Sequence, residues 1–551
     1  MKKENYFLLS IFVLIFSLPS FGQKTVVVVE PDPGIEIGAL NKAILAVDSL
    51  QRDNTIFELR RDGHYYLNGA ISHIGYTLHI RTEDGAGSKA VIVPGLDELG
   101  ESDRQFNPSG NLTLERVYVL GRDELGASNQ QPINVLADNC RIIIDDCVMD
   151  YSAQSFVRTG SKDNKIYIKN SILRNCTKPD DPANGRIIDT RGNPNDTLWI
   201  SQCTIYNSSA TQLRSDGAKI NFANFDHNTV FATAFAHNMA LDYMLKVKIT
   251  NNIFFNFLWR GNNTSHDAMF RADSISVARA GVLGYDDADR YFDLSNNNWY
   301  VDDTIAYIDT TYGPLEFKFY SWDTEQADTI WYKQMPRKNW FANDYLIEND
   351  PESTPDIIKF IESGQVDTSN LFREKLTFEN PPPLNLDYWK FYAENGFNIR
   401  GMDTPQTWAD ENPLVLGEVQ TGAFNFRYNT DSRSHTGADH GLPLGALRWW
   451  PEVAVSAKDI KLRNGVSAFP NPFDNQVTFQ INAGESSVIK VQIYDMLGRE
   501  MHSFNGTVNQ GDNEINVNLG DLKQSGIFLY QIQFETRKGM KSISSGKIIK
   551  K

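Results

Sequence analysis

The chain has 551 residues and a formal net charge of −16, with 53 basic and 69 acidic side chains. Residues 456–551 carry 12 Lys and Arg against 9 Asp and Glu, so the body that precedes them holds a charge of about −20. Such a body repels polyphosphate, which argues against nucleic acid as a partner. A polyanionic sugar is accepted only where a local Arg or Lys cluster or a divalent cation reverses the field.

The first residues have the pattern of a cleaved export signal. Lys2 and Lys3 precede an apolar run over residues 6–18, which is followed by small residues up to Gly22. A run of about 13 residues is too short to span a bilayer. We therefore predict a signal peptide over residues 1–22 and no transmembrane segment.

The residues that follow predict a capped start to a repetitive β structure. Residues 33–52 place Leu40 and Ile44 at helical spacing, which predicts an amphipathic helix over the open end of the stack. Short alternating strands separated by Gly follow over residues 55–94, and a further strand pair follows over residues 111–120.

A short template repeats between residues 140 and 300. Each copy has an apolar residue, two polar residues, a small or amide residue, and then a second apolar strand. The fourth positions are Cys147, Ser171, Cys203, Asn228, Asn252 and Asn297, spaced 24, 32, 25, 24 and 45 residues apart. A period near 24 is the coil length of a right-handed parallel β-helix, whose coils lie about 4.8 Å apart. We therefore predict an all-β solenoid over residues 23–450.

The residue types at the fourth position suit the inside of a turn between two strands. Asn side chains can stack as a ladder from coil to coil, and small Cys or Ser side chains fit the same place. Cys147 and Cys203 would lie two coils apart, roughly 9 to 10 Å by the strand spacing, which is beyond the reach of a disulfide. We predict buried core cysteines and a structural Asn ladder.

The template is lost from about Val301, and an aromatic-rich insertion is expected over residues 301–400. It contains Trp322, Trp331, Trp340 and Trp389. This segment is either a loop system along the solenoid or a small subdomain, and its rings either wall a sugar-binding groove or form its own core. Residues 424–428 and 441–450 are expected to close the body, and residues 451–466 have the composition of a linker.

Polar residues gather in the strands that precede the template strands. They are Arg158, Arg186, Asp189, Arg191, Arg214, His237 and Asp242. If they point outward on neighbouring coils, they form a stripe of mixed charge wide enough for a sugar chain. The alternative for each is a solvated ion pair at a turn, such as Asp189 with Arg191.

That residue set fits β-elimination from a uronate. The reaction needs a cation to neutralise the carboxylate, a base for the adjacent proton and an acid for the leaving oxygen, often beside Ca²⁺. His227 fits a turn residue better than a base. The acidic cluster Asp286–Asp289 lacks the Gly-anchored spacing of a calcium loop. The adjacent Asp145 and Asp146 face opposite ways in a strand, which argues against a paired-acid hydrolase.

Four blocks of the body are similar to pectate-lyase-superfamily β-helix proteins of Bacteroidetes, near the chondroitinase-B and alginate-lyase family. The blocks are Glu58–Gly69, Arg186–Gly192, Phe225–Val230 and Pro443–Trp449. The resemblance implies a monomer that binds or cleaves an acidic, uronic-acid-containing polysaccharide, with calcium as the only expected cofactor. The lyase family's block with its Lys base, and its later His-Gly stretch with acidic calcium ligands, have no counterpart at matching positions. A non-catalytic carbohydrate-binding or adhesion protein on the cell surface is therefore the alternative.

The last 85 or so residues carry three blocks in a fixed order. These are Pro470-Asn471-Pro472, then Tyr494-Asp495-x-x-Gly498-Arg499, then Gly546-Lys547-x-x-Lys550. Together they resemble the C-terminal sorting domain of type IX secretion cargo. The resemblance implies a small β-sandwich over residues 467–551 that contacts the type IX machinery. It also implies export to the cell surface or the medium.

Overall fold

The structure of the chain is a computed structural model. It describes residues 24–34, 36–96, 100, 104–123, 125–177, 184–209, 211–235, 239–259, 269–312, 316–321, 326–331, 356–394, 424–453, 464–469, 473–483, 486–495, 499–509, 511–522, 525–536 and 541–550. The predicted signal peptide lies outside these residues. The chain divides into two compact units, Met1–Ala446 and Leu447–Lys551.

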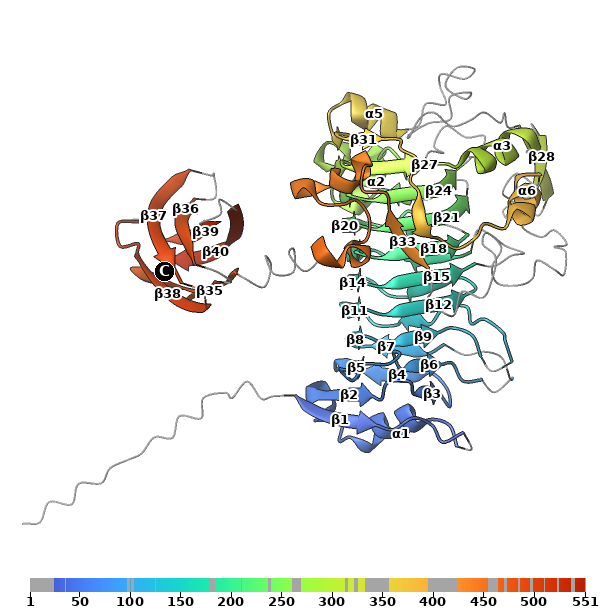
Figure 1. The fold of residues 1–551 in the computed structure, drawn as a ribbon, viewed down its shortest axis with the longest axis horizontal. Helices are drawn as coiled ribbons and strands as arrows, with labels where there is room; N and C mark the ends of the chain where they lie inside the picture. The colour runs from blue at the N-terminus through green and yellow to red at the C-terminus, as the bar shows by residue number, and fades with distance from the viewer. Residues whose placement is uncertain are drawn as a thin grey trace, which may run out of the picture. The chain divides into compact units, whose positions relative to one another are not determined.

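Three parallel sheets wind around one core in the first unit, and a complete coil passes from sheet A to sheet B to sheet C (Figure 1). Sheet A contains β1 (Thr25–Val29), β2 (Thr55–Leu59), β5 (Leu78–Thr82), β8 (Leu112–Glu115), β11 (Arg141–Asp145), β14 (Lys165–Lys169), β17 (Asn195–Ser201), β20 (Ile220–Asp226), β23 (Lys246–Thr250), β26 (Tyr291–Asp293) and β30 (Val366–Asp367).

Sheet B contains β3 (His64–Tyr66), β6 (Val91–Val93), β9 (Tyr118–Leu120), β12 (Val148–Ser152), β15 (Ile172–Cys176), β18 (Thr204–Ser208), β21 (Thr229–Phe235), β24 (Ile253–Trp259), β27 (Asn297–Tyr300) and β31 (Leu371–Phe372). Sheet C contains β4 (Ile71–Ile74), β7 (Phe106–Ser109), β10 (Ile133–Val135), β13 (Ser155–Thr159), β16 (Arg186–Asp189), β19 (Leu213–Arg214), β22 (Met239–Asp242) and β25 (Phe270–Ala272). The predicted right-handed parallel β-helix is confirmed.

Inward side chains of successive strands stack in columns, because the strand pairs that link these coils are parallel and in register. One column in each sheet reads Ile144, Ile168, Ile200, Phe225 in sheet A, Met149, Leu173, Ile205, Val230 in sheet B, and Ile133, Val157, Ile188, Leu213 in sheet C, all fully buried. Burying one such side chain stabilises the fold by about 1.5–3 kcal/mol. Each coil is therefore held mainly by its two neighbours.

The Asn ladder lies at the turn from sheet A to sheet B, as predicted. Asn228, Asn252 and Asn297 are fully buried. The Oδ1 of Asn252 accepts the backbone N–H of Asn228 at 2.8 Å, and the Oδ1 of Asn297 accepts that of Asn252 at 2.9 Å. The Asn252 Nδ2 donates to the Phe225 carbonyl at 2.9 Å. Each amide thus pairs backbone groups of adjacent coils, which would otherwise be buried without partners.

The cysteines are core residues, as predicted. All four are buried free thiols. The strand register puts Ser171 between Cys147 and Cys203, so these two cysteines lie two coils apart. Complete burial raises the pKa of the Cys147 thiol to about 12.

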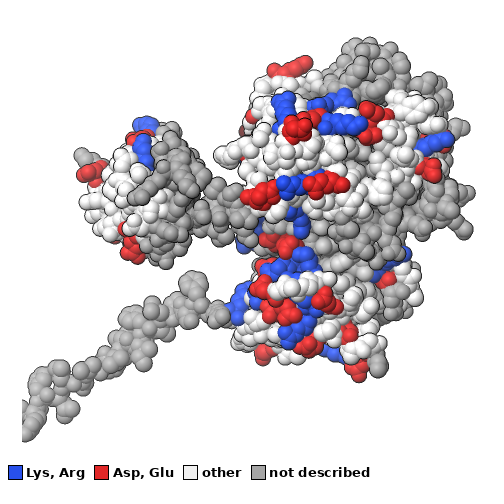
Figure 2. Space-filling view, in the orientation of Figure 1, with Lys and Arg blue, Asp and Glu red and all other residues white. Residues whose placement is uncertain are grey.

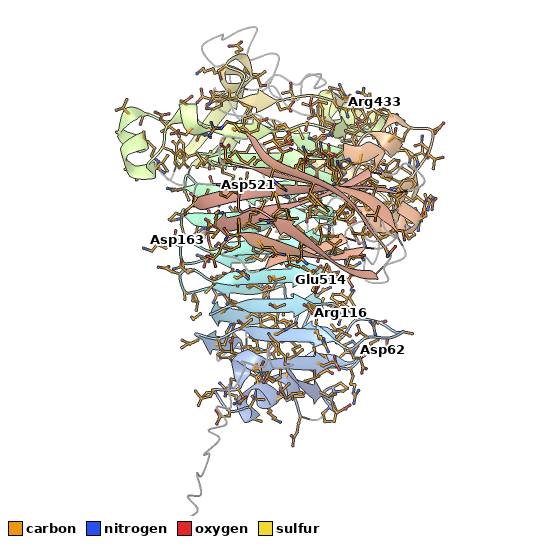
Figure 3. The ribbon with its side chains drawn as sticks, turned by 90° about the vertical axis from the view of Figure 1, so that its left-hand side faces the viewer. Asp62, Arg116, Asp163, Arg433, Glu514 and Asp521 are labelled. Carbon is orange, nitrogen blue, oxygen red and sulfur yellow. The ribbon has the colours of Figure 1, made fainter. Side chains whose placement is uncertain are left out.

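A left-handed residue precedes each fourth position and makes the turn from sheet A to sheet B tight. These residues are Asp146, Asn170, Gln202, His227, Asn251 and Asn296, and Asn370 is the equivalent residue of the last coil, all with φ between 50° and 61°. Most are Asn, Asp or His, the non-glycine types that tolerate this region best. His227 is thus a turn residue, as predicted. In Figure 3, Asp62 and Arg116 mark this edge of sheet A, and Asp163 marks the opposite edge, where sheet C leads back to sheet A.

A short helix covers the N-terminal end of the stack. Helix α1 (Ala39–Ala46) contacts β1 and β3 and buries Leu40 and Ile44. The cap prediction is confirmed in place but wrong in length, because Gly38 with φ of 87° precedes the helix and Val47 is already extended. The remainder of the predicted span is turn and a 3₁₀ helix, η1 (Arg52–Asn54).

The repeat template is lost at about Val301, but the coils of the structure continue beyond that residue. Strand β30 pairs with β26, β31 pairs with β27, and Asn370 makes the left-handed turn between the two added strands. Two-residue strands are too short to show the template. Helices and strands outside the coils are α2 (Val277–Leu283), η2 (Asp287–Asp289), α3 (Asp303–Tyr312), β28 (Glu316–Ser321), β29 (Gln326–Trp331), α5 (Asp356–Glu362) and α6 (Leu386–Glu394).

The segment that closes the first unit, residues 424–446, runs back over earlier coils, and we call it the returning segment. Its strand β33 (Asn425–Tyr428) pairs with β32 (Phe378–Asn380). Rings of these strands, Phe378 and Phe426, pack on Phe231 and Phe255 of sheet B at centroid distances of 5.1–5.9 Å. The outer face of sheet B is therefore covered here by aromatic packing.

Polar contacts fasten the same segment to the turn between sheets A and B. The Gly445 N–H donates to the Asn251 carbonyl at 2.9 Å. The Asp439 carboxylate accepts the Asn251 amide at 3.1 Å and the Asn296 amide at 2.9 Å. Two 3₁₀ helices, η6 (Arg433–Thr436) and η7 (Asp439–Gly441), make these turns, and Figure 3 shows Arg433 at this edge.

The second unit begins with η8 (Leu447–Trp449) and contains two antiparallel sheets. Their strands are β34 (Asn464–Phe469), β35 (Gln476–Ala483), β38 (Gly511–Asn518) in one sheet, and β37 (Glu500–Val508), β36 (Ser487–Tyr494), β39 (Gly526–Thr536), β40 (Lys541–Lys550) in the other. Strand β34 starts inside the predicted linker. Residues such as Val477 and Phe479 from one sheet share a buried cluster with Val491 and Ile532 from the other. This arrangement is a small β-sandwich.

Candidate functional site: an arginine row on sheet C

Outward side chains of sheet C form a row across successive coils. Strand pairing aligns Asn134, Arg158, Asp189, Arg214, Ala240 and Arg271 at one height. Their chain neighbours Val157, Ile188 and Leu213 are fully buried in the core, and side chains alternate along a strand, so this row faces outward. Adjacent members are about 4.8 Å apart. The structure thus brings Arg158, Asp189 and Arg214 together on one face.

Asp189 is the centre of the charged part of the row. Its carboxylate is 2.9 Å from Arg186 Nη1 and 3.5 Å from Arg214 Nη1. It also accepts the backbone N–H of Arg191 at 3.2 Å. Only 2 % of Asp189 is exposed. The carboxylate therefore orients Arg186 rather than offering itself to a ligand, while Arg214 donates to the Asp216 carboxylate at 2.6 Å.

Arg158 differs from its neighbours because nothing in the described part of the chain pairs with its guanidinium. Burial lowers the pKa of Arg158, the positive charges of Arg191 and Arg104 lower it further, and Asp189 opposes this. Burial and the nearby Arg214 likewise lower the pKa of Arg186. The row has three arginines and one aspartate, and Asp216 pairs with Arg214 while Asp242 pairs with Arg271. The excess of positive charge therefore lies around Arg158, and an anionic ligand requires such a local excess on a strongly acidic body.

Charged side chains elsewhere on the solenoid are mostly paired. On sheet A, Arg81 lies 2.6 Å from Glu58, and Lys169 lies 3.0 Å from Asp145. Figure 2 shows such interleaving of basic and acidic residues over the lower coils on the face that it draws. The arginine excess on sheet C is thus a local feature and not the general character of the surface.

Asp242 belongs to the end of the row but is closed off. It is fully buried, accepts the Ser215 hydroxyl at 2.6 Å and the Gly217 N–H at 3.0 Å, and receives the Arg271 Nε at 2.8 Å. Burial opposes ionisation, but Arg271 and the two hydrogen bonds outweigh it and hold the pKa of Asp242 below its usual value. Asp242 therefore anchors Arg271. The other predicted residue, His237, lies outside the described residues.

The row includes residues that the sequence patterns did not single out. Arg271 follows an apolar residue in a strand, and the same pattern occurs in Val157-Arg158 and Leu213-Arg214. This repeated apolar–Arg pair is the sequence signal that could have identified Arg271. Arg104 precedes β7 and acts on Arg158 through space, and no local pattern marks it.

The acidic clusters considered as calcium ligands have structural partners. Asp286 caps the Ala288 N–H, and Asp287 accepts the Ile275 N–H at 3.0 Å and Arg290 Nη1 at 3.0 Å. Asp289 accepts the Asp286 N–H at 3.1 Å. Among the described residues, no group of three or more His, Cys, Asp or Glu side chains could hold a metal ion. A calcium requirement stays a prediction.

The described residues of the aromatic insertion do not form the wall of a groove on sheet C. Trp389 of α6 is fully buried, which fits the alternative of a small core for that segment. Trp322 and Trp340 lie outside the described residues. An open aromatic surface occurs instead on sheet A, at Tyr167 and Trp199.

Two of the three tail blocks have structural roles in the second unit, and Pro470-Asn471-Pro472 lies outside the described residues. The Asp495 carboxylate binds the Arg499 guanidinium at 2.7 Å and its N–H at 3.0 Å, which closes the turn between β36 and β37. Lys550 donates to the Leu519 carbonyl at 3.0 Å, and the Phe473 N–H donates to the Ile549 carbonyl at 2.8 Å. The last strand is thus tied to the first residues of the sandwich.

Residues 467–549 match the family of secretion system C-terminal sorting domains. No curated protein matches the chain. No helix in the described part is long and apolar enough to cross a membrane. The chain is therefore a parallel β-helix protein with a type IX sorting domain, exported to the cell surface or the medium.

Proposed function

We propose that the protein binds an acidic, uronic-acid-containing polysaccharide along the arginine row of sheet C. The observation that carries this proposal is Arg158, a partly buried guanidinium that forms no ion pair or hydrogen bond with the described part of the chain. Arg214 lies two strands away in the same row, roughly 10 Å along the helix axis. Two cations at this separation suit a polymer that carries carboxylates at regular intervals.

A carboxylate is the anion that this arrangement favours. The planar guanidinium presents paired N–H donors that match the two oxygens of a carboxylate. The acidic body repels a large polyanion at long range, but salt screens charges beyond about 8 Å at physiological ionic strength. Contacts within the row therefore decide binding once the chain is near.

Binding is tested with polygalacturonate, alginate and chondroitin, and with neutral dextran as the control ligand. We expect at least one uronate polymer to bind, and the affinity to fall with added salt. Arg158→Ala should weaken binding about tenfold or more, because a hydrogen bond to a charged group contributes about 1.5–3 kcal/mol. Arg158→Lys should recover only part of it, because Lys lacks the fork of donors.

Arg141→Ala, at an exposed position on sheet A, is the matched control and should bind like the unaltered protein. Thermal unfolding of each variant separates loss of binding from loss of folding. Uronate polymers that bind no better than dextran, or an Arg158→Ala variant that binds them unchanged, would overturn the proposal.

The lowered pKa of Arg158 favours a second candidate function, cleavage of the bound chain by β-elimination. A base takes the proton from the carbon beside the carboxylate, a carbon–carbon double bond forms, the bond to the glycosidic oxygen breaks, and water supplies a proton to that oxygen. Arg214 would neutralise the carboxylate, and a lowered pKa increases the unprotonated fraction of Arg158 that can take the proton. Ultraviolet absorbance of the unsaturated product, with and without Ca²⁺, tests this. Binding without product identifies the alternative, a non-catalytic carbohydrate-binding or adhesion protein.

A further inference from the structure

A row of aromatic side chains lies on the outer face of sheet A, away from the arginine row. Tyr167 on β14 pairs with Trp199 on β17, and Phe222 on β20 pairs with Thr197, two positions before Trp199. The ring centroids of Tyr167 and Trp199 are 6.4 Å apart, and those of Trp199 and Phe222 are 6.0 Å apart. All three side chains are partly exposed.

The three rings stand on a flat, rigid base. Their chain neighbours Ile166, Leu198 and Ala223 are fully buried in the core, so the backbone beneath the rings cannot shift easily. The Trp199 Nε1 donates to the Ser201 hydroxyl at 2.8 Å, which holds the orientation of the indole. The rings thus form a fixed surface that rises along the helix axis from coil to coil.

Polar side chains border the rings on both sides. On one side, Lys165 lies 3.5 Å from Asp196, which also accepts the Asn221 amide at 3.1 Å. On the other side, Lys169 lies 3.0 Å from Asp145. These pairs balance their charges, so the border offers hydrogen-bonding groups and no excess of either sign.

A buried amide beside the rings has an unused donor. Asn224 pairs with Trp199 across the strands, and only 4 % of it is exposed. Its Nδ2 has no hydrogen-bond partner among the residues that the structure describes. An unpaired buried donor costs about 1–3 kcal/mol, which a ligand hydroxyl would relieve by accepting a hydrogen bond.

We propose that Tyr167, Trp199 and Phe222 form a second carbohydrate-binding site, which takes a linear, neutral polysaccharide whose sugar rings stack on the aromatic row. Aromatic faces attract the C–H faces of sugar rings, and the polar borders suit the hydroxyls at the ring edges. A row one side chain wide with Lys and Asp on its borders is unlike the core of a protein interface, which is depleted in such residues.

The site differs from the arginine row in the ligand that it takes. The charged side chains that border the aromatic row are paired, so they provide no net positive charge to attract a polyanion, whereas the arginine row has excess positive charge. The two sites lie on different sheets of the same rigid solenoid, so one protein could hold an acidic and a neutral polysaccharide together. Failure of one proposal leaves the other intact.

The test measures binding of the chain without its signal peptide to soluble β-glucan, xylan and cello-oligosaccharides, by titration calorimetry and by quenching of tryptophan fluorescence. We expect binding to at least one of these probes. Trp199→Ala should weaken it roughly tenfold or more, and Tyr167→Ala should weaken it less. Trp199→Phe, which keeps a ring, should retain most of the affinity.

Ile56→Ala is the matched control, because Ile56 has the same outward position on sheet A four coils away from Tyr167. Its affinity should equal that of the unaltered chain. Arg158→Ala should bind the neutral probes normally, and Trp199→Ala should bind uronate polymers normally. Absence of binding to every neutral probe, or binding that survives Trp199→Ala, overturns the proposal. Dimers in sedimentation that Trp199→Ala abolishes also overturn it, in favour of a second copy of the chain as the occupant.

Discussion

Buried amides carry much of the specificity of this solenoid at the scale of single residues. A parallel stack of identical coils could slip by one coil unless something marks the register between neighbours. Asn228, Asn252 and Asn297 provide such marks, because each amide must meet one backbone N–H and one carbonyl in the adjacent coil. Hydrophobic columns alone would tolerate a slip that these pairs do not.

Asn252→Ala should lower the free energy of unfolding by about 3 kcal/mol. The change removes the acceptor of the Asn228 N–H and leaves the Phe225 carbonyl unpaired in a dry core. Urea denaturation followed by circular dichroism measures the loss. Asn68→Ala, at an exposed position, should change stability by less than about 0.5 kcal/mol, and equal effects of the two changes would refute the structural role of the ladder.

Asp242 should make the solenoid sensitive to acid. Its pKa in the folded protein lies below the unfolded value of about 3.9, so its contribution is full above that pH and is lost as the pH falls toward the folded pKa. Asp242→Asn should cost about 3 kcal/mol at neutral pH, because Arg271 loses the charge of its buried carboxylate partner and keeps only the more distant Asp273 carboxylate at 3.9 Å among its ion pairs with described residues. The change should also flatten the decline in melting temperature below pH 4. The exposed Asp84 is the control: Asp84→Asn should leave that decline unchanged.

At the scale of elements, the returning segment links chain positions that are far apart in sequence. Gly445 has φ of 81°, and a Cβ there would lie 2.5 Å from the Thr229 hydroxyl and 3.0 Å from Ile253 Cδ1. The close approach brings the Gly445 N–H to Asn251. This glycine therefore allows the returning segment to pack closely against sheet B, where Phe426 covers the aromatic side chains of that sheet.

Gly445→Ala should release the returning segment while leaving the coils folded. Residue 445 has a left-handed backbone conformation, and the new methyl group would collide with the Thr229 hydroxyl. The returning segment must therefore move away from sheet B, which exposes Phe231 and Phe255. Hydrogen exchange over residues 424–446 and binding of a hydrophobic dye should both rise. Gly441→Ala is the control, because Gly441 has φ of 70° but open space around its Cβ position. Equal effects of the two changes would point to backbone strain and not to the contact.

Sequence periodicity predicted elements well where strands are long and poorly where they are short. Strands of four to seven residues, such as β11 and β20, show the template clearly. The last coil has only two residues in each of β30 and β31, and strands of that length are too short to show the template. The sequence placed Arg158, Asp189 and Arg214 in one stripe, and in the structure they share a row that also includes Arg271, while Asp242 binds Arg271 from below the surface; their role as a site stays a prediction.

At the scale of the whole molecule, the chain divides into two units with different features. The first unit carries the arginine row, and the second carries the match to the sorting domain family over residues 467–549. The second unit has its own buried cluster, built from both of its sheets. A sorting signal with its own core does not require the solenoid for its fold.

Deleting residues 467–551 should leave the β-helix folded but retained in the periplasm of its host. The circular dichroism spectrum and the first melting transition of the truncated protein should match those of the solenoid in the full chain. Cell fractionation should find the truncated protein in the periplasm and the full chain outside. Truncated protein at the surface or in the medium at normal levels would show that another segment directs export.

By itself, the sequence determined that the body is a parallel β-helix and that the tail is a sorting domain. A period near 24 with an amide or small residue at one fixed point leaves few other ways to bury the apolar strands, and the tail blocks are local. Only the tertiary structure decided which outward residues share a face, because turns of unequal length separate Arg158, Asp189 and Arg214 in sequence. The same holds for Tyr167, Trp199 and Phe222. The register between two strands sets which side chains become neighbours, and the sequence of one strand alone does not specify that register.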